Sequence, residues 1–159
     1  MGGGYQPTLR EGQAAPNVPF RTLDGTPVRL AELAAAGPVL LVFFKDTCPT
    51  CHLTLPLLDR IREGRLKLCG VSQDDEARTR AFARDYGISF DLLVDPADGY
   101  VASNAFGVTH VPSMFVVEPD MRISWAATGF VRLDMESLGE IAGLPVLDES
   151  DDLPATKPG

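Results

Sequence analysis

The chain has 159 residues, the length of one ordinary domain, and the proportions of hydrophobic (45%) and charged (23%) residues are typical of a globular protein. Its formal net charge of −8 argues against nucleic acid or an anionic membrane surface as a partner, because both bind basic patches. No apolar run approaches the roughly 20 residues needed to cross a bilayer, so we expect no membrane span.

The two ends of the chain differ in composition from its middle. Residues 1–13 are rich in glycine and polar residues, and we expect them to form a flexible N-terminal segment. They contain neither a basic start nor an apolar stretch, so the sequence as written predicts a cytoplasmic protein, or an extracytoplasmic one if an N-terminal signal or anchor has been removed. Residues 14–147 are expected to form one domain, and the acidic residues 148–159 a disordered tail.

Turn dipeptides and apolar patterns predict the elements of this domain. Residues 18–23 and 28–30 flank Asp24-Gly25 and favour a hairpin. Residues 39–44 are apolar throughout, which is typical of a central strand buried on both faces. The pattern also predicts helices at 31–36, 49–63, 74–86, 99–106 and 134–142, and strands at 66–72, 91–94, 113–117 and 122–127. This order indicates an α/β fold with a central mixed sheet flanked by helices.

The sequence Cys48-Pro49-Thr50-Cys51 lies where the predicted central strand passes into the next helix. A thiol at a helix N-terminus faces unpaired amide groups and the positive end of the helix dipole, and both favour its thiolate form. Pro49 suits the first helical turn, where its missing N–H has no partner to lose. We therefore expect Cys48 to be the exposed attacking thiol and Cys51 the buried thiol that resolves the mixed disulfide.

Neighbouring residues are expected to tune this pair. Thr47 could cap the helix through its hydroxyl, and His52 could stabilise the thiolate. Cys69 lies in a predicted strand and is interpreted as a small core residue. For His110, loop hydrogen bonding and a functional contact are both open. Because the remaining Cys and His residues are scattered along the chain, we expect no metal site.

With the cysteine motif in place, the chain resembles the thioredoxin superfamily, and within it the TlpA/ResA-like, redoxin (AhpC/TSA-related) thiol–disulfide oxidoreductases. Residues 15–28 look like the N-terminal hairpin of this family, Pro56 resembles the proline that kinks the active-site helix, and residues 106–117 are similar to the stretch around its cis-proline. The resemblance implies a thioredoxin-like fold and a cis Val111–Pro112 bond facing the cysteines.

The same resemblance implies what the site contacts. Val111, Pro112, Pro49 and Thr50 are expected to bind the substrate. The implied partners are protein thiols or disulfides and an unidentified electron donor or acceptor, with no cofactor beyond the redox-active Cys48–Cys51 disulfide. No long insertion offers a dimerisation domain, so we expect a monomer.

Two departures from the family bear on proton transfer. Val42 and Thr54 stand where family members carry an acid that takes the proton of the resolving cysteine. Proton transfer is then expected to depend on water, or on His52 if its ring turns toward Cys51.

Two alternative functions remain. A peroxiredoxin-like thiol peroxidase needs a threonine three residues before its reactive cysteine, where this chain has Lys45 before Cys48 and Cys48 before Cys51. A Sco-like copper-binding assembly factor has three residues between its cysteines, where this chain has Pro49 and Thr50 alone.

Overall fold

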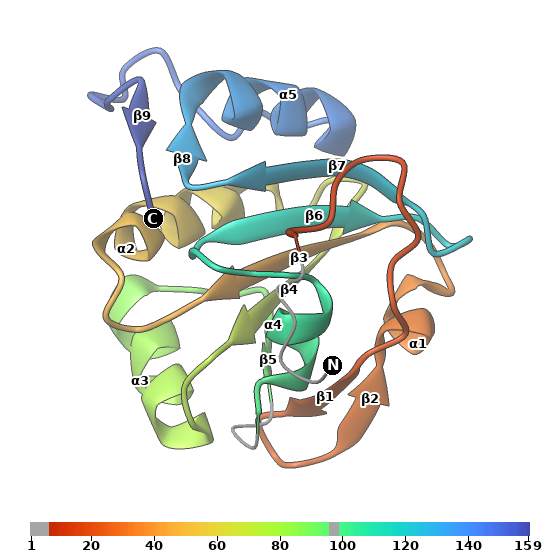
Figure 1. The fold of residues 1–159 in the computed structure, drawn as a ribbon. Coiled ribbons are helices and arrows are strands. Elements are labelled where there is room, and N and C mark those ends of the chain that lie inside the picture. The colour runs from red at the N-terminus through yellow and green to blue at the C-terminus, as the bar shows by residue number, and fades with distance from the viewer. Residues whose placement is uncertain (1–6, 96–98) are drawn as a thin grey trace.

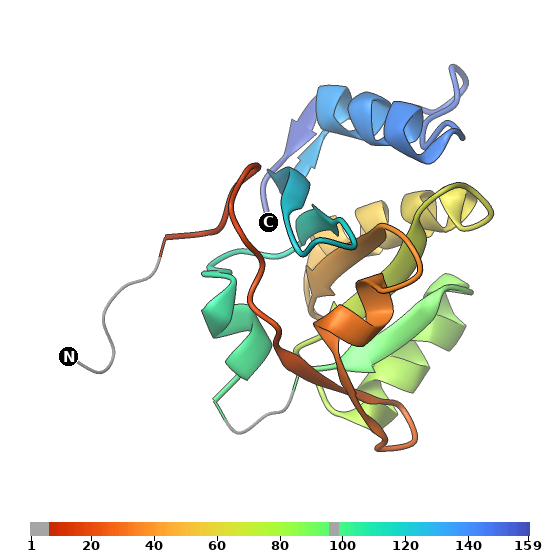
Figure 2. The same cartoon turned by 90° about the vertical axis from the view of Figure 1, so that its right-hand side faces the viewer.

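The computed structural model describes residues 7–95 and 99–159. Residues 1–6 of the segment expected to be flexible therefore lie outside the described residues. A seven-stranded sheet runs through the molecule, with helices against both of its faces (Figures 1 and 2). Its strands are β1 (Pro19–Thr22), β2 (Pro27–Arg29), β3 (Val39–Phe44), β4 (Lys67–Ser72), β5 (Asp91–Val94), β6 (Ser113–Val117) and β7 (Ile123–Thr128). The helices are α1 (Leu30–Ala34), α2 (Pro49–Leu58), the 3-10 turn η1 (Asp59–Ile61), α3 (Glu76–Tyr86), α4 (Val101–Ala105) and α5 (Arg132–Ala142).

The order of the strands across the sheet is β2-β1-β5-β4-β3-β6-β7. The middle strands β3, β4 and β5 are parallel, whereas β6 and β7 pair antiparallel beyond β3, and β1 and β2 pair antiparallel beyond β5. Val42 on β3 lies between Gly70 on β4 and Met114 on β6. The predicted mixed sheet and its N-terminal strand pair are confirmed.

Strand β3 is buried along its whole length, as its apolar sequence predicts. Its even-numbered side chains join a hydrophobic cluster with residues of α2, α3 and α5. Its odd-numbered side chains join a second cluster, on the opposite face, with residues of α1 and α4. This alternation follows from the two-residue period of a strand, and it fixes the end of β3 firmly beneath the start of α2.

Helix α2 begins and helix α3 ends where expected, but the end of α2 and the start of α3 differ from the expected ranges. α2 ends at Leu58 and continues as the 3-10 turn η1, so the predicted helix to residue 63 is too long. α3 begins at Glu76, because Asp75 caps it by accepting the backbone N–H of Arg78 at 2.8 Å. Asp74, predicted as the first residue of this helix, therefore lies before it, and its carboxylate accepts a hydrogen bond from the backbone of Asp46.

The described part of the N-terminal segment packs along the domain, which differs from the expected flexible segment. The backbone N–H of Leu9 donates to the carbonyl of Phe106 at 3.0 Å, and that of Gly12 donates to Ile123 at 2.8 Å. Ala14 forms an isolated antiparallel bridge with Arg122 beside β7. These pairings are with residues far along the chain, so local composition does not reveal them.

The C-terminal segment, expected to be disordered, also has a defined course. Two short strands, β8 (Phe130–Val131) and β9 (Thr156–Lys157), pair antiparallel as a separate small sheet (Figure 1). Leu153 packs against the first hydrophobic cluster. Asp151 pairs with Arg60 at 2.7 Å. The acidic composition of this segment predicted disorder. Composition does not reveal that Arg60 and the first hydrophobic cluster lie close enough to hold the segment.

Within residues 7–95 and 99–159, no helix is long and apolar enough to cross a membrane. The same residues contain no group of three or more His, Cys, Asp or Glu side chains placed to hold a metal ion.

Candidate active site

Cys48 lies at the turn between β3 and α2 and is itself the N-cap residue of the helix. Its backbone is extended, and its sulfur accepts the backbone N–H of Cys51 at 3.2 Å. Pro49 occupies the first helical turn, as predicted. The expected cap by Thr47 is wrong, because the helix starts at Pro49 and the capping position falls on Cys48. The Cys48 sulfur thus takes the place that a capping oxygen has at an ordinary helix start.

The other two cysteines are fully buried, and all three are free thiols. Burial raises the pKa of the Cys51 thiol, and the adjacent Cys48 sulfur raises it further. Cys69 lies on β4 in the cluster on the opposite face of the sheet from Cys51. Burial raises the pKa of Cys69 to about 12. The site therefore holds one accessible thiol and one protected thiol, with Cys69 apart from both.

The loop before β6 faces Cys48. The Val111–Pro112 peptide bond is cis, as the family resemblance implies. The Cys48 thiol donates to the Val111 carbonyl oxygen at 3.4 Å, which places the loop backbone directly beside the half-buried sulfur. The loop is held by the Ser113 hydroxyl, which donates to the His110 carbonyl at 2.6 Å. His110 itself is exposed, and its ring contacts the Thr109 hydroxyl at 3.1 Å.

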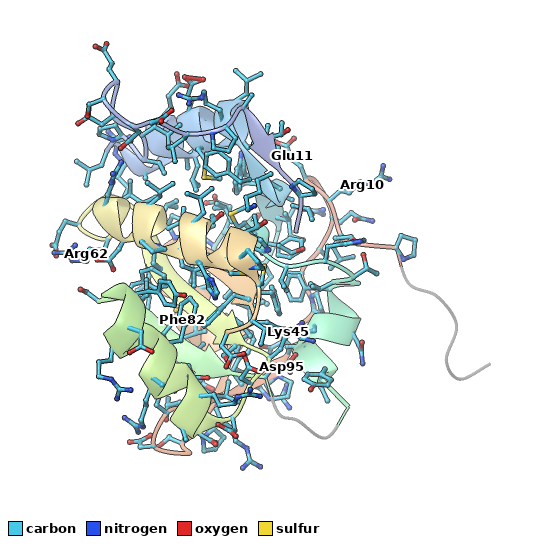
Figure 3. All side chains as sticks on the ribbon, turned by 90° about the vertical axis from the view of Figure 1, so that its left-hand side faces the viewer. Arg10, Glu11, Lys45, Arg62, Phe82 and Asp95 are labelled. Atoms are coloured by element: carbon cyan, nitrogen blue, oxygen red, sulfur yellow. The ribbon has the colours of Figure 1, made fainter. Side chains whose placement is uncertain are left out.

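His52 is engaged away from the thiols. Its Nε2 donates to the backbone carbonyl of Asp46 at 2.5 Å, and its ring stacks on Tyr86 at a centroid distance of 4.5 Å. The side chain of Phe82 lies between α2 and α3 (Figure 3), with its ring centroid 6.0 Å from that of His52 and 4.8 Å from that of Tyr86. The His52 ring is thus held by Tyr86 of α3 and by the Asp46 carbonyl in the turn between β3 and α2, and a turn toward Cys51 would break both contacts.

An acidic group at the turn between β3 and α2 is a feature that the sequence interpretation missed. Asp74 accepts the backbone N–H of Asp46 at 2.8 Å, and Arg78 reaches both carboxylates, at 3.2 Å for Asp46 and 3.9 Å for Asp74. Burial raises the pKa of Asp74, and its negative charge contributes to the raised pKa of Cys51. The available signal was that Asp74 follows β4 as Cys48 follows β3, because the carboxyl ends of parallel neighbours meet at one edge.

Thr54, where the family resemblance implies an acid, is fully buried on α2. Its hydroxyl oxygen has no hydrogen-bond partner among the described residues. The Thr54 side chain therefore places this hydroxyl oxygen in the buried interior beneath α2.

The structure brings together most of the predicted site residues. Cys48, Cys51, Thr50, Val111 and Pro112 meet where α2 begins beside the loop before β6. Pro49 is exposed at the rim of this site, and Thr50 is buried. A dithiol at the start of a helix, on a sheet of this topology and facing a cis-proline loop, defines a thioredoxin-fold protein.

The chain belongs to the AhpC/TSA family, whose profile matches residues 12–126. It is 30% identical over 94 residues to thioredoxin-like protein YneN of Bacillus subtilis, a match that covers 55% of each chain. It is 24% identical over 133 residues to thiol-disulfide oxidoreductase ResA of the same organism, covering 80% of this chain and 73% of ResA. The chain thus spans about half the length of the first relative and about three quarters of the second.

A solved structure with the same fold is the thioredoxin domain of a thiol-disulfide oxidoreductase from Bacteroides vulgatus. It superposes with a TM-score of 0.73 at 18% identity, over 85% of this chain and 99% of that domain. The predicted thioredoxin-like fold and the predicted family are therefore confirmed. ResA and the Bacteroides vulgatus protein are both named thiol-disulfide oxidoreductases, the enzyme class expected from the sequence.

Proposed function

We propose that this protein exchanges disulfides with protein substrates, with Cys48 as the attacking thiol and Cys51 as the resolving thiol. The observation that carries the proposal is the position of the Cys48 sulfur. It accepts an N–H at the start of α2 and lies 3.4 Å from the Val111 carbonyl of the facing loop. The sulfur therefore lies at the helix start and beside backbone that an extended substrate can reach.

In the reducing direction, the Cys48 thiolate attacks one sulfur of the client disulfide and releases the other client sulfur as a thiolate. Cys51 then loses its proton and attacks the Cys48 sulfur, which releases the second client thiol. The client gains two electrons, and the protein is left with a Cys48–Cys51 disulfide. A thiol donor must reduce this disulfide before the next cycle, and the reverse sequence oxidises a client dithiol.

No cofactor besides the two cysteines is needed for this exchange, and no metal takes part in it. The trapping experiment described below also captures the protein donor or acceptor that recycles the pair.

If a signal or anchor segment precedes this sequence in the cell, the clients are extracytoplasmic disulfides; otherwise they are cytoplasmic ones. Size-exclusion chromatography tests the proposed monomer.

Reduction of insulin in the presence of dithiothreitol, followed with single cysteine variants, tests the assignment. We expect Cys48→Ser and Cys51→Ser to lose turnover, because each removes one sulfur of the exchange. Cys69→Ser is the matched control and should retain it, since Cys69 lies on the other face of the sheet. Full activity in Cys48→Ser would exclude the proposed mechanism.

The order of the two thiols is tested by trapping. Cys51→Ser should accumulate mixed disulfides through Cys48, because the resolving attack is lost. Non-reducing electrophoresis and mass spectrometry of the adducts identify both the client and the bonded cysteine. Adducts on Cys51 in the Cys48→Ser protein would reverse the two roles. Consumption of hydrogen peroxide by the same variants separates this function from thiol peroxidase activity.

A further inference from the structure

The end of the described chain lies on the surface assigned above to the client. The Thr50 hydroxyl donates to the carbonyl of Pro158 at 2.6 Å. Gly159 lies so close to Val111 that a Cβ added to it would overlap the Val111 carbonyl oxygen and come 3.3 Å from the Val111 nitrogen. Figures 1 and 2 both show β9 running beside β8 and ending near the start of α2. Residues 155–159 are called the terminal segment below.

A series of contacts fixes the terminal segment in this place. Its β9 residues pair with Phe130 and Val131 of β8. The backbone N–H of Arg132 donates to the Ala155 carbonyl at 2.8 Å. The Arg132 guanidinium donates to the Leu153 carbonyl at 2.6 Å, and Arg60 holds Asp151 through two hydrogen bonds of 2.7 and 3.0 Å. The segment is thus an extended strand with anchors immediately before it.

The terminal segment lies against two residues next to the reactive thiol. Val111 contacts the Cys48 sulfur from the loop before β6, and Thr50 follows Cys48 by two residues on α2. Strand addition to such backbone is a general way to bind an extended peptide. The terminal segment makes its contacts with these same two residues, so a client strand and the segment cannot both use them.

We propose that the terminal segment is an internal competitor for the client site, which an extended peptide strand must displace before it reaches Cys48. This rests on the proposed function, because it takes the surface around Thr50 and Val111 as the client site. The partner that fits is a peptide in extended conformation whose backbone replaces Pro158 and Gly159. An attached segment acts at an effective concentration on the order of millimolar, so weak clients are excluded and strongly binding ones are admitted.

The test uses the full chain with two substitutions in the segment. Lys157→Pro removes an N–H from β9, and Gly159→Ala places a Cβ against the Val111 carbonyl, so the double variant should leave the site. The matched control carries Thr156→Ala, an exposed side chain, and Gly37→Ala, where an added Cβ meets nothing within 4 Å. A labelled synthetic peptide of residues 153–159 is the probe, and fluorescence anisotropy measures its binding.

We expect the peptide to bind the double variant at least about tenfold more tightly than the wild type or the control, because only the double variant has a vacated site. The double variant should also show a several-fold lower KM for a disulfide-bonded peptide client, with the control unchanged. Equal peptide binding by all three proteins would overturn the proposal, and so would an unchanged KM. Loss of insulin reduction in every protein would instead contradict the proposed function, since the peptide-binding measurement needs no redox activity.

Discussion

At the scale of single residues, the two site cysteines differ because the chain places one sulfur at a helix cap and the other in the core. Cys48 is half-buried and accepts an N–H, whereas Cys51, one helical turn later, is fully buried. Burial favours the neutral form of a thiol, because a thiolate loses its hydration there. The difference between the two thiols therefore follows from their positions on one short helix.

This difference predicts selective alkylation of the folded, reduced protein. At about pH 8, iodoacetamide should modify Cys48, while Cys51 and Cys69 react at least about tenfold more slowly, because each unit of raised pKa lowers the thiolate fraction tenfold. Peptide mass spectrometry over a time course measures the three rates. The urea-unfolded protein is the control, in which all three should react alike. Modification of Cys51 as fast as Cys48 in the folded protein would contradict the observed burial.

Asp151 offers a pH test of the anchor before the terminal segment. Its hydrogen bonds from Arg60 lower the pKa of the carboxyl to about 2. A carboxyl whose pKa is lowered in the folded protein stabilises that fold above its unfolded value, and the contribution disappears as the pH falls through the folded value. The Arg60–Asp151 contact should therefore persist at neutral pH and be lost between about pH 4 and 2.

NMR titration of the Asp151 carboxyl carbon measures this value directly. Arg60→Gln should move the midpoint upward toward that of an ordinary aspartate. Arg62→Gln is the control, because Arg62 pairs with Asp59 and Glu63 and makes no ion pair with Asp151. An unchanged midpoint in Arg60→Gln would show that Arg60 does not hold this carboxylate in solution.

At the scale of elements, the starts of α2 and α3 are set by different chemistry. α2 has a sulfur cap and a proline in its first turn, and α3 has a carboxylate cap from Asp75. Both helices begin at the same edge of the sheet, after the parallel strands β3 and β4. The reactive sulfur thus occupies the position that an ordinary capping oxygen takes in the neighbouring helix.

The α3 cap predicts a measurable loss of stability. Asp75→Ala should lower the free energy of unfolding by about 1 kcal/mol, because the backbone N–H of Arg78 loses its acceptor. Asp75→Asn keeps a capping oxygen and should lose much less. Urea denaturation followed by circular dichroism measures both variants. Equal losses in the two would mean that the carboxylate charge, rather than the cap hydrogen bond, stabilises this helix end.

At the scale of the whole molecule, the central sheet leaves no room at Gly70. A Cβ at this position on β4 would come 2.6 Å from Leu92 on β5, 3.1 Å from Phe44 on β3 and 3.2 Å from Phe90. These side chains belong to the cluster beneath α2 and α3. The close approach at Gly70 therefore links three strands to the helix layer that carries the active-site thiols.

Gly70→Ala should accordingly destabilise the protein by about 1–3 kcal/mol, because the neighbours must leave their preferred rotamers to admit a methyl group. Gly37→Ala is the control, since nothing lies within 4 Å of its added Cβ. Thermal and urea unfolding of the two variants gives the comparison. A Gly70→Ala protein as stable as the control would show that Leu92, Phe44 and Phe90 can move to admit a methyl group without a loss of stability.

The sequence by itself determined the elements whose cause is local. The uninterrupted apolar run 39–44 predicted a strand buried on both faces, and Cys48-Pro49-Thr50-Cys51 shortly after it predicted a dithiol at a helix start. The family resemblance added the cis-proline loop, which the structure places 3.4 Å from Cys48. Element order, sheet type and the candidate thiols all follow from these signals.

Tertiary structure decided the contacts that join distant segments. Asp74 contacts the turn between β3 and α2 because β4 lies beside β3, and the His52 ring is held by Tyr86 of α3 and by the Asp46 carbonyl of that turn. The end of the chain reaches Thr50 across more than a hundred residues. Composition marked residues 148–159 as too acidic and too poor in apolar residues to fold by themselves. They are ordered because a folded domain supplies Arg60, Arg132 and the edge of β8, and a linear pattern cannot contain partners that only the completed fold brings near.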